Sequence, residues 1–219
     1  MNKYKTIYKK SSLRSPTKKR FDIKSDNEWE DDMGGEQITC EDNHIYFYDN
    51  VNAKNILSLI KHIKNINIKL SALQSEFNIK YGTSVDFNIY LHINSSGGYV
   101  TDAFAALDHI EKSKFPIISI VEGYAASAAT FLSVVCSKRQ ITKTSSMLIH
   151  QLSGDCSGTY EQLEDHHENN KYLEDCIKKL YIKYTNRKLN SKLLEKVLKH
   201  DLMWNAEKCL RYGLVDEII

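Results

Sequence analysis

Residues 122–135 read EGYAASAATFLSVV and place one hydroxyl, that of Ser127, among alanines where an apolar strand-like run passes into a helix. The commonest role of a serine in a helix is to bond back to a carbonyl one turn earlier. Gly123, however, lets the chain turn sharply out of the strand, and the alanines let backbones approach closely. Ser127 is therefore expected at the N-terminus of a buried helix, where the Ala128 N–H is a natural donor to a developing oxyanion.

Strand and helix patterns alternate on the N-terminal side of this stretch. Three strand patterns and two runs of helically spaced apolar residues follow one another at 44–49, 53–63, 86–94, 101–113 and 115–123. Thr101 is the expected N-cap of the second helix. The order β-α-β-α-β predicts an α/β fold of stacked βαβ units with right-handed crossovers.

On the C-terminal side, a helix over 125–136 is followed by two short strand-like runs, RQIT at 139–142 and MLIH at 147–150. A long helix is predicted from about Thr159 to Tyr184. One face of it is apolar: Leu173, Ile177, Leu180, Tyr181 and Tyr184. This stripe is longer than one small domain needs, as is typical of a helix that packs in an oligomer. Two further helices are expected over 191–199 and 205–213.

Composition limits the class of protein. With 30 basic and 28 acidic side chains the net charge is +2, so neither nucleic acid nor a membrane is an expected partner. The five cysteines form no CxxC pair, so no metal site, cofactor or disulfide framework is expected. A cytoplasmic location, or an organelle matrix, fits this best. Residues 1–43 read as a charged, flexible arm, and residues 65–84 as an extra segment, either a helix or a surface excursion.

A serine nucleophile needs a base, and the base needs an orienting partner. Among the eight histidines, His150 closes an apolar strand and precedes a polar loop, so it is either a base that projects from a strand end or a packed side chain. The stretch INSSGGYVTD, 93–102, brings Gly97 and Gly98 to another strand end. This pair is either a simple turn or the source of a second unhindered N–H at the carboxyl edge of the sheet.

Four motifs together resemble a known family. INSSGG, GYAASAATFL, MLIHQ and D…NAEKCLRYGLVDEI follow one another at near-family spacing and are similar to the proteolytic subunit of Clp proteases over residues 44–219. The resemblance implies a ClpP/crotonase-like fold of stacked βαβ units with a protruding handle helix. It implies a serine endopeptidase in which Ser127 is the nucleophile, His150 the base and Asp201 the acid. This assignment ranks four other acids lower: Asp155, Asp165, Asp175 and Asp216.

The resemblance also implies further features of the site and the assembly. The N–H groups of Gly98 and Ala128 match the oxyanion hole of the family, and the long helix matches the handle by which two heptameric rings stack around a chamber for unfolded polypeptides. This sequence departs from the family pattern at three positions. Ser96 replaces a proline. Leu152 and Asp155 stand where the family's strand that pairs with substrate has Pro and Gly. Asp155 is therefore expected to bind substrate and to favour basic residues.

The sequence leaves alternatives open both for the docking of a partner and for the function. His92 falls where an aromatic residue often lines the pocket for the unfoldase's apolar loop, while Tyr90 and Ile120 keep their apolar character, which leaves docking of an AAA+ unfoldase open. Two alternatives to a peptidase remain. One is a structural ring subunit that does not cleave, and the other is an acyl-CoA enzyme of the crotonase fold, which needs no Ser–His pair.

Overall fold

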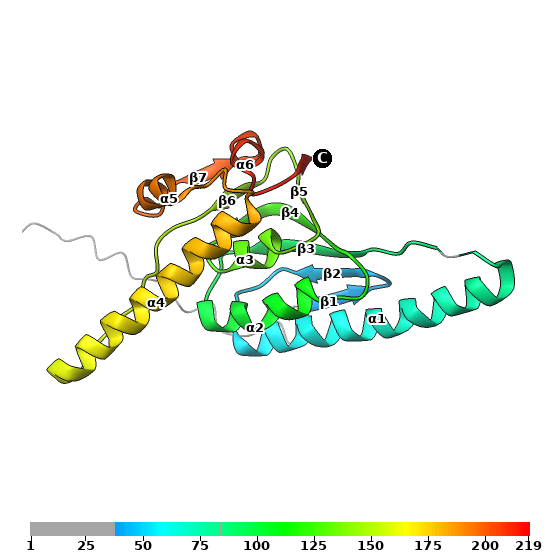
Figure 1. Ribbon diagram of the computed structural model, residues 1–219, viewed down its shortest axis with the longest axis horizontal. Coiled ribbons are helices and arrows are strands. Elements are labelled where there is room, and N and C mark those ends of the chain that lie inside the picture. The colour runs from blue at the N-terminus through cyan, green and yellow to red at the C-terminus, as the bar shows by residue number, and fades with distance from the viewer. Residues whose placement is uncertain (1–37, 84) are drawn as a thin grey trace, which may run out of the picture. The chain divides into compact units, whose positions relative to one another are not determined.

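The computed structural model describes residues 38–83 and 85–219, which contain eight strands and six helices joined by loops (Figure 1). Of the flexible arm expected over residues 1–43, residues 1–37 lie outside this range. In chain order the elements are β1 Ile38–Glu41, β2 His44–Phe47, α1 Ala53–Tyr81, β3 Ile89–Ser95, α2 Val100–Glu111, β4 Ile117–Ala126, α3 Ala129–Val134, β5 Lys138–Ile141, β6 Ser146–Leu148, α4 Tyr160–Tyr184, α5 Ser191–Val197, β7 Met203–Asn205, α6 Ala206–Tyr212 and β8 Glu217–Ile218.

The strands form one sheet in the order β1-β2-β3-β4-β5-β8, and β6 joins it beside β4 and carries β7. Only the β1–β2 and β6–β7 pairs of these described strands are antiparallel, so the predicted α/β fold with parallel crossovers is confirmed. The long strand β4 pairs through 118–121 with β5 and through 124–126 with β6. Between these halves Gly123 adopts a φ of 77°, a conformation that glycine reaches without steric cost.

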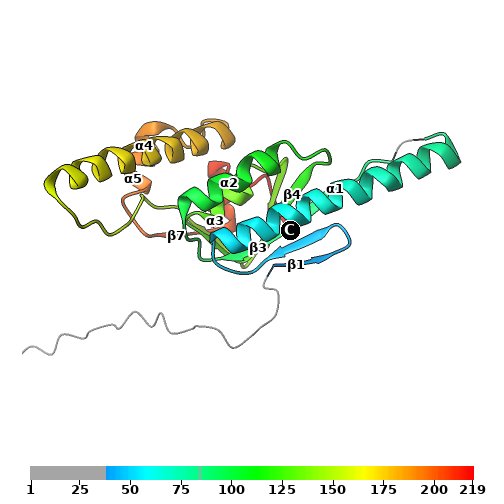
Figure 2. The same ribbon diagram turned by 90° about the horizontal axis from the view of Figure 1, so that it is seen from below.

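Helices α1 and α2 lie side by side against the sheet (Figure 2). The buried face of α1 repeats at helical spacing and consists of Ile56, Leu59, Ile63, Ile66 and Leu70. The extra segment near 65–84 is largely a continuation of this helix, which runs for 29 residues until Gly82 ends it in the left-handed conformation. Its last turns expose Phe77, Ile79 and Tyr81. Within the described residues, none of the helices has the combined length and apolar character that crossing a membrane would require.

Three predicted boundaries are wrong. Strand β1 lies inside the range assigned to the N-terminal arm and pairs with β2, so the folded part begins earlier than residue 44. Helix α2 starts at Val100, and its N-cap is Tyr99, because the Tyr99 N–H donates to Val51 O (2.9 Å) and leads the chain directly into the helix. The helix expected over 125–136 begins at Ala129, since β4 continues to Ala126.

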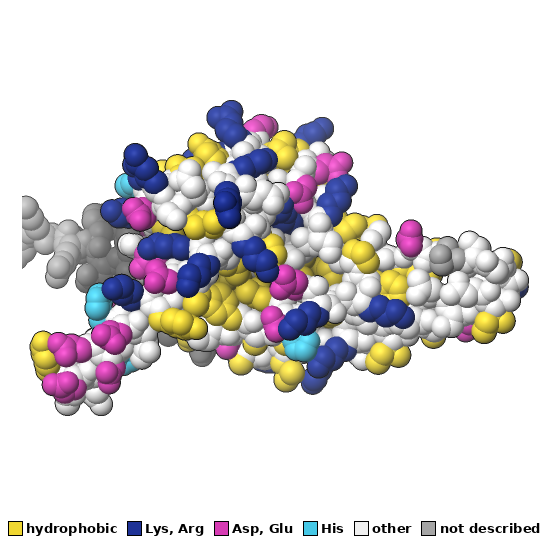
Figure 3. All heavy atoms as spheres, viewed as in Figure 1, with side chains coloured by type: hydrophobic (Ala, Val, Ile, Leu, Met, Phe, Trp, Pro, Cys, Tyr) yellow, Lys and Arg dark blue, Asp and Glu magenta, His cyan; other side chains and the backbone are white. Residues whose placement is uncertain are grey.

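Helix α4 confirms the predicted long helix and divides into two halves. Thr159 caps it and forms a capping box with Gln162. The C-terminal half buries Ile177, Leu180 and Tyr181 in the core of the same chain, whereas residues 160–172 are exposed throughout and project from the body (Figure 1). Acidic side chains gather at the free end of α4, and its lysines lie mostly on the other half (Figure 3).

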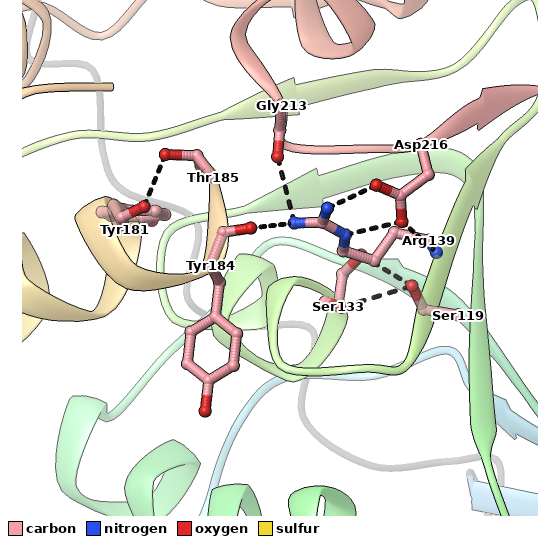
Figure 4. A network of polar contacts seen from close by, with 8 residues as sticks. All are labelled: Ser119, Ser133, Arg139, Tyr181, Tyr184, Thr185, Gly213 and Asp216. Atoms are coloured by element: carbon pink, nitrogen blue, oxygen red, sulfur yellow. Dashed lines mark hydrogen bonds and ion pairs between the residues drawn. The ribbon is translucent and has the colours of Figure 1, made fainter. Parts of the chain in front are cut away.

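Arg139 connects the last elements of the chain to the sheet (Figure 4). Its side chain is 8% exposed, and its guanidinium donates to both carboxylate oxygens of Asp216, to Gly213 O (3.0 Å) and to Tyr184 O. Burial alone would raise the pKa of Asp216, but the hydrogen bonds and charge of Arg139 outweigh it, so this pKa lies below its ordinary value. Arg139 therefore joins β5, the end of α4 and the end of α6.

Candidate active site

Ser127 lies in the tight turn between β4 and α3, with a φ of 52°. Its N–H donates to Leu148 O (2.8 Å), which ties the turn to the end of β6, and its carbonyl accepts from Thr130 N–H (3.0 Å). The side chain is half-buried, and within the described residues its hydroxyl takes part in no hydrogen bond. The ordinary role of a helix serine, a bond back to a carbonyl, is thus not found, and the hydroxyl remains free to react.

Gly97 packs directly against the Ser127 turn, because β3 and β4 are parallel neighbours whose ends meet, and Gly98 packs against Val51. A Cβ atom on Gly97 would lie 2.6 Å from Ala126 O and 2.8 Å from Ser127 Cβ, and one on Gly98 would lie 2.2 Å from Val51 O. Only glycine fits between these neighbours, and both positions have positive φ, 97° and 146°. Gly97 thus lies beside Ser127, and the role of Gly98 as a donor stays a prediction.

Two backbone N–H groups are free at this junction. Among the described residues, the amide of Gly98 and that of Ala128 donate no hydrogen bond, although Ala128 is fully buried. A buried N–H group is almost always paired, so the unpaired Ala128 N–H is available to an acceptor that binds there, whereas the N–H of the exposed Gly98 is open to solvent. Ser96 donates its hydroxyl to Asn50 Oδ1 (2.7 Å), an interaction that a proline at this position could not make.

His150 and Asp201 are in contact, with 3.1 Å between Nδ1 and Oδ1. His150 comes two residues after the end of β6, and Asp201 two residues before β7; the antiparallel pairing of these strands brings the two side chains together. The imidazole is 22% exposed and the carboxylate 78% exposed. In the described residues no hydrogen bond joins Ser127 Oγ to His150, a contact that often tightens only when substrate binds.

The other acids are placed elsewhere. Asp165 and Asp175 are exposed on α4, and Asp216 is bound by Arg139. Asp155 is exposed within residues 151–158, where the structure has no strand, so the substrate-pairing strand expected there is not formed in the chain alone. Gln151 N–H donates to Leu198 O (2.7 Å), whereas residues 152–158 make no main-chain hydrogen bond within the described part of the chain, and an extended peptide can order such a segment by pairing with it.

A second polar cluster, missed from the sequence, lies on the sheet face formed by β2, β3 and β4. His44 Nδ1 lies 2.8 Å from His92 Nε2, and His92 Nδ1 lies 2.9 Å from Glu122 Oε1. Tyr48 donates its hydroxyl to the other oxygen of Glu122. Burial, then the neighbouring His92, lowers the pKa of His44. Burial and the bond to Glu122 raise the pKa of Tyr48 to about 12.

Aromatic rings extend this cluster. Tyr46 stacks on His92 with 4.5 Å between ring centroids, and Tyr90 stacks on His44 at 4.7 Å. The period-two alternation in HIYFYD and DFNIYLHIN puts the two His and two Tyr side chains on one face of the sheet. This alternation is the sequence signal from which the cluster could have been predicted. The hydrogen bonds of these side chains depend on the parallel register of β2 and β3, which the sequence does not reveal. The surroundings of His92 are thus polar and aromatic.

No group of three or more His, Cys, Asp or Glu side chains within the described ranges is arranged to hold a metal ion. The chain was compared with protein-family models. The model described as Clp protease matches residues 42–219, which include every strand and helix described above except β1.

Proposed function

Because the chain belongs to the Clp protease family, we propose that it is a serine endopeptidase subunit with Ser127 as nucleophile, His150 as general base and Asp201 as the acid that orients the imidazole. The observation that supports this most is the meeting of three strand ends. Ser127 follows β4, His150 follows its neighbour β6, and Asp201 precedes β7, which pairs with β6. The free hydroxyl and the His–Asp contact are therefore within one small part of the sheet.

In the proposed reaction, Ser127 Oγ attacks the carbonyl carbon of a peptide bond and His150 Nε2 takes the hydroxyl proton. Asp201 accepts the Nδ1–H and thereby stabilises the imidazolium that forms. The tetrahedral intermediate then collapses: the C–N bond breaks, His150 gives its proton to the leaving amine, and an acyl-enzyme remains. Water attacks this ester with His150 again as base, which releases the carboxylate product and restores Ser127.

The charge that develops on the substrate oxygen needs donors. The unpaired N–H groups of Gly98 and Ala128 are the proposed pair, since they lie on the two backbone segments that meet at Ser127. Glycine at 97 and 98 is what permits this close approach. Asp155 is proposed to bind substrate. It is exposed in the segment without regular structure that follows His150, where it would face residues of a bound peptide.

The assembly is also proposed from the family. Two stacked heptameric rings would bury the free half of α4, whose exposed apolar side chains include Tyr160, Leu163 and Tyr172. The sites would then face a closed chamber that admits only unfolded polypeptide. Docking of an AAA+ unfoldase stays an open part of the proposal, because the cluster around His92 differs from an apolar pocket.

Labelling by a fluorophosphonate probe tests the proposal. The assembled wild-type protein should be labelled at Ser127, as located by peptide mapping, and should cleave an unfolded protein substrate. Ser127→Ala should lose labelling and at least about 10³-fold of activity, and His150→Ala about as much, because triad members act as a unit. Ser96→Ala, which removes a nearby hydroxyl, is the matched control and should be labelled normally. A wild-type assembly that is neither labelled nor active would instead identify a structural ring subunit.

A further inference from the structure

A buried chain of hydrogen bonds runs from helix α4 to the Ser127 turn. Thr130 Oγ1 lies 2.6 Å from Ser127 O and 2.6 Å from Tyr181 Oη. Thr130 is fully buried and Tyr181 is 1% exposed, so neither hydroxyl has access to water. Nothing in the proposed catalytic mechanism uses these two side chains.

The direction of both bonds follows from the chemistry of the groups. A carbonyl oxygen only accepts, so the Thr130 hydroxyl proton must point to Ser127 O. The Thr130 oxygen can then accept the single proton of the Tyr181 hydroxyl. Burial raises the pKa of Tyr181, which keeps this proton in place at any working pH. The chain therefore runs in one direction, from Tyr181 to Thr130 to the Ser127 carbonyl.

The carbonyl that receives this chain belongs to the same planar peptide group as the Ala128 N–H. In a trans peptide the C=O and N–H bonds point in opposite directions, so fixing one fixes the other. The turn also needs such support, because Ser127 has a φ of 52°, which costs a residue with a Cβ about 1 kcal/mol or more. The Thr130 N–H supplies one bond to this carbonyl and its hydroxyl the second.

We propose that Thr130 and Tyr181 are positioning residues that hold the Ser127–Ala128 peptide group so that its N–H points at the oxyanion formed during peptide cleavage. The inference rests on the proposed function. It makes α4, the helix whose other half projects from the body, a direct support of the site, through a contact between residues 51 positions apart in the chain.

Steady-state kinetics of the assembled full-length chain test this role. Loss of an oxyanion donor costs about 10²–10³-fold in kcat; a donor that is present but loosely held should cost about tenfold. Thr130→Val and Tyr181→Phe should therefore lower kcat about tenfold and change KM less than twofold. Binding of a peptide aldehyde, which forms an oxyanion with the serine, should weaken by the same factor as kcat. Thr130→Ser keeps the hydroxyl and should restore activity.

Ser133→Ala is the matched control. Ser133 lies on the same short helix, is fully buried, and bonds to Ser119 Oγ (2.9 Å) and not to the Ser127 turn. It should lower thermal stability as much as Thr130→Val does, without a change in kcat. If Thr130→Val does not fold, Tyr181→Phe, which removes one oxygen, carries the test.

Two outcomes separate the two proposals. If wild type cleaves through Ser127 but the Thr130 and Tyr181 variants match Ser133→Ala in kcat and aldehyde affinity, the positioning role is wrong and the peptidase assignment stands. If Ser127→Ala retains labelling and activity, the nucleophile assignment fails, and the positioning role fails with it.

Discussion

Replacing Arg139 by methionine should destabilise the fold far more than the same change at its neighbour Lys138. Both residues are on β5, and each pairs with an acid near the C-terminus: Arg139 with Asp216, Lys138 with Glu217. The two pairs differ in surroundings. The Arg139 side chain is 8% exposed and also donates to two main-chain carbonyls, whereas Lys138 is 48% exposed and its interactions are limited to the surface.

The magnitude follows from the groups left unpaired. Arg139→Met leaves the carbonyls of Tyr184 and Gly213 without their donor, at about 1 kcal/mol each. Asp216 is 39% exposed, so solvent screens its charge, and the lost ion pair adds only about 1 kcal/mol. The expected total is about 3 kcal/mol of the free energy of unfolding, a large share of the 5–15 kcal/mol typical of a domain. Lys138→Met should cost less than about 1 kcal/mol.

Urea denaturation followed by far-UV circular dichroism measures both variants. Each titration should be run at two protein concentrations, because assembly adds a concentration-dependent term to apparent stability. The urea midpoint should fall clearly for Arg139→Met and hardly for Lys138→Met. Equal shifts for the two variants would show that the buried network is no stronger than a surface ion pair, and the reasoning from burial would be refuted.

Three further predictions concern acidity, assembly and specificity. The pKa of Asp216 is lower in the folded than in the unfolded chain, so the stabilisation from its pairing is complete above the unfolded pKa of about 3.8 and is lost as pH falls through the folded pKa. The difference in free energy of unfolding between wild type and Arg139→Met should therefore narrow between pH 7 and pH 3. Urea midpoints that diverge on acidification would contradict this. Leu163→Asp, on the exposed half of α4, should split the assembly as seen by light scattering and leave the circular dichroism spectrum unchanged. Ile177→Asp should lower the free energy of unfolding by more than about 3 kcal/mol, because Ile177 is buried within the chain. The opposite pattern would mean that the handle contact lies nearer the body. Asp155 should make the wild type cleave basic peptides several-fold faster than acidic ones at low salt. Asp155→Gly should remove this preference without slowing the cleavage of neutral peptides. A wild type that cleaves both kinds equally would place this carboxylate away from the substrate.

Much of the fold was predictable because strands and helices alternate with clear periods. Ser127, the glycine pair at 97–98 and His150 each follow the end of a strand, and parallel neighbours bring such ends to one edge of a sheet. The pairing of β6 with β7, which brings Asp201 to His150, was not readable, since three-residue strands have too little pattern. For that acid the family resemblance was the stronger guide.

Other features depend on contacts that no local pattern encodes. Thr101 has the chemistry of an N-cap, but the bridge between Val51 and Gly98 starts α2 earlier. The segment after residue 65 has mixed polar composition, and it remains helical because the first part of α1 is already anchored to the sheet and extension adds one hydrogen bond per residue. The Thr130–Tyr181 contact joins two hydroxyls whose surroundings read simply as buried helix.

The double pairing of β4 has a consequence for how this chain tolerates change. The proposed nucleophile, base and acid all depend on one small fork of the sheet, the C-terminal half of β4 with β6 and β7. Their mutual spacing is set by a few residues of register and is independent of what lies at the far ends of the longer elements. Changes in the length or composition of peripheral segments, such as the exposed tip of α1, can therefore occur while the reacting atoms keep their places.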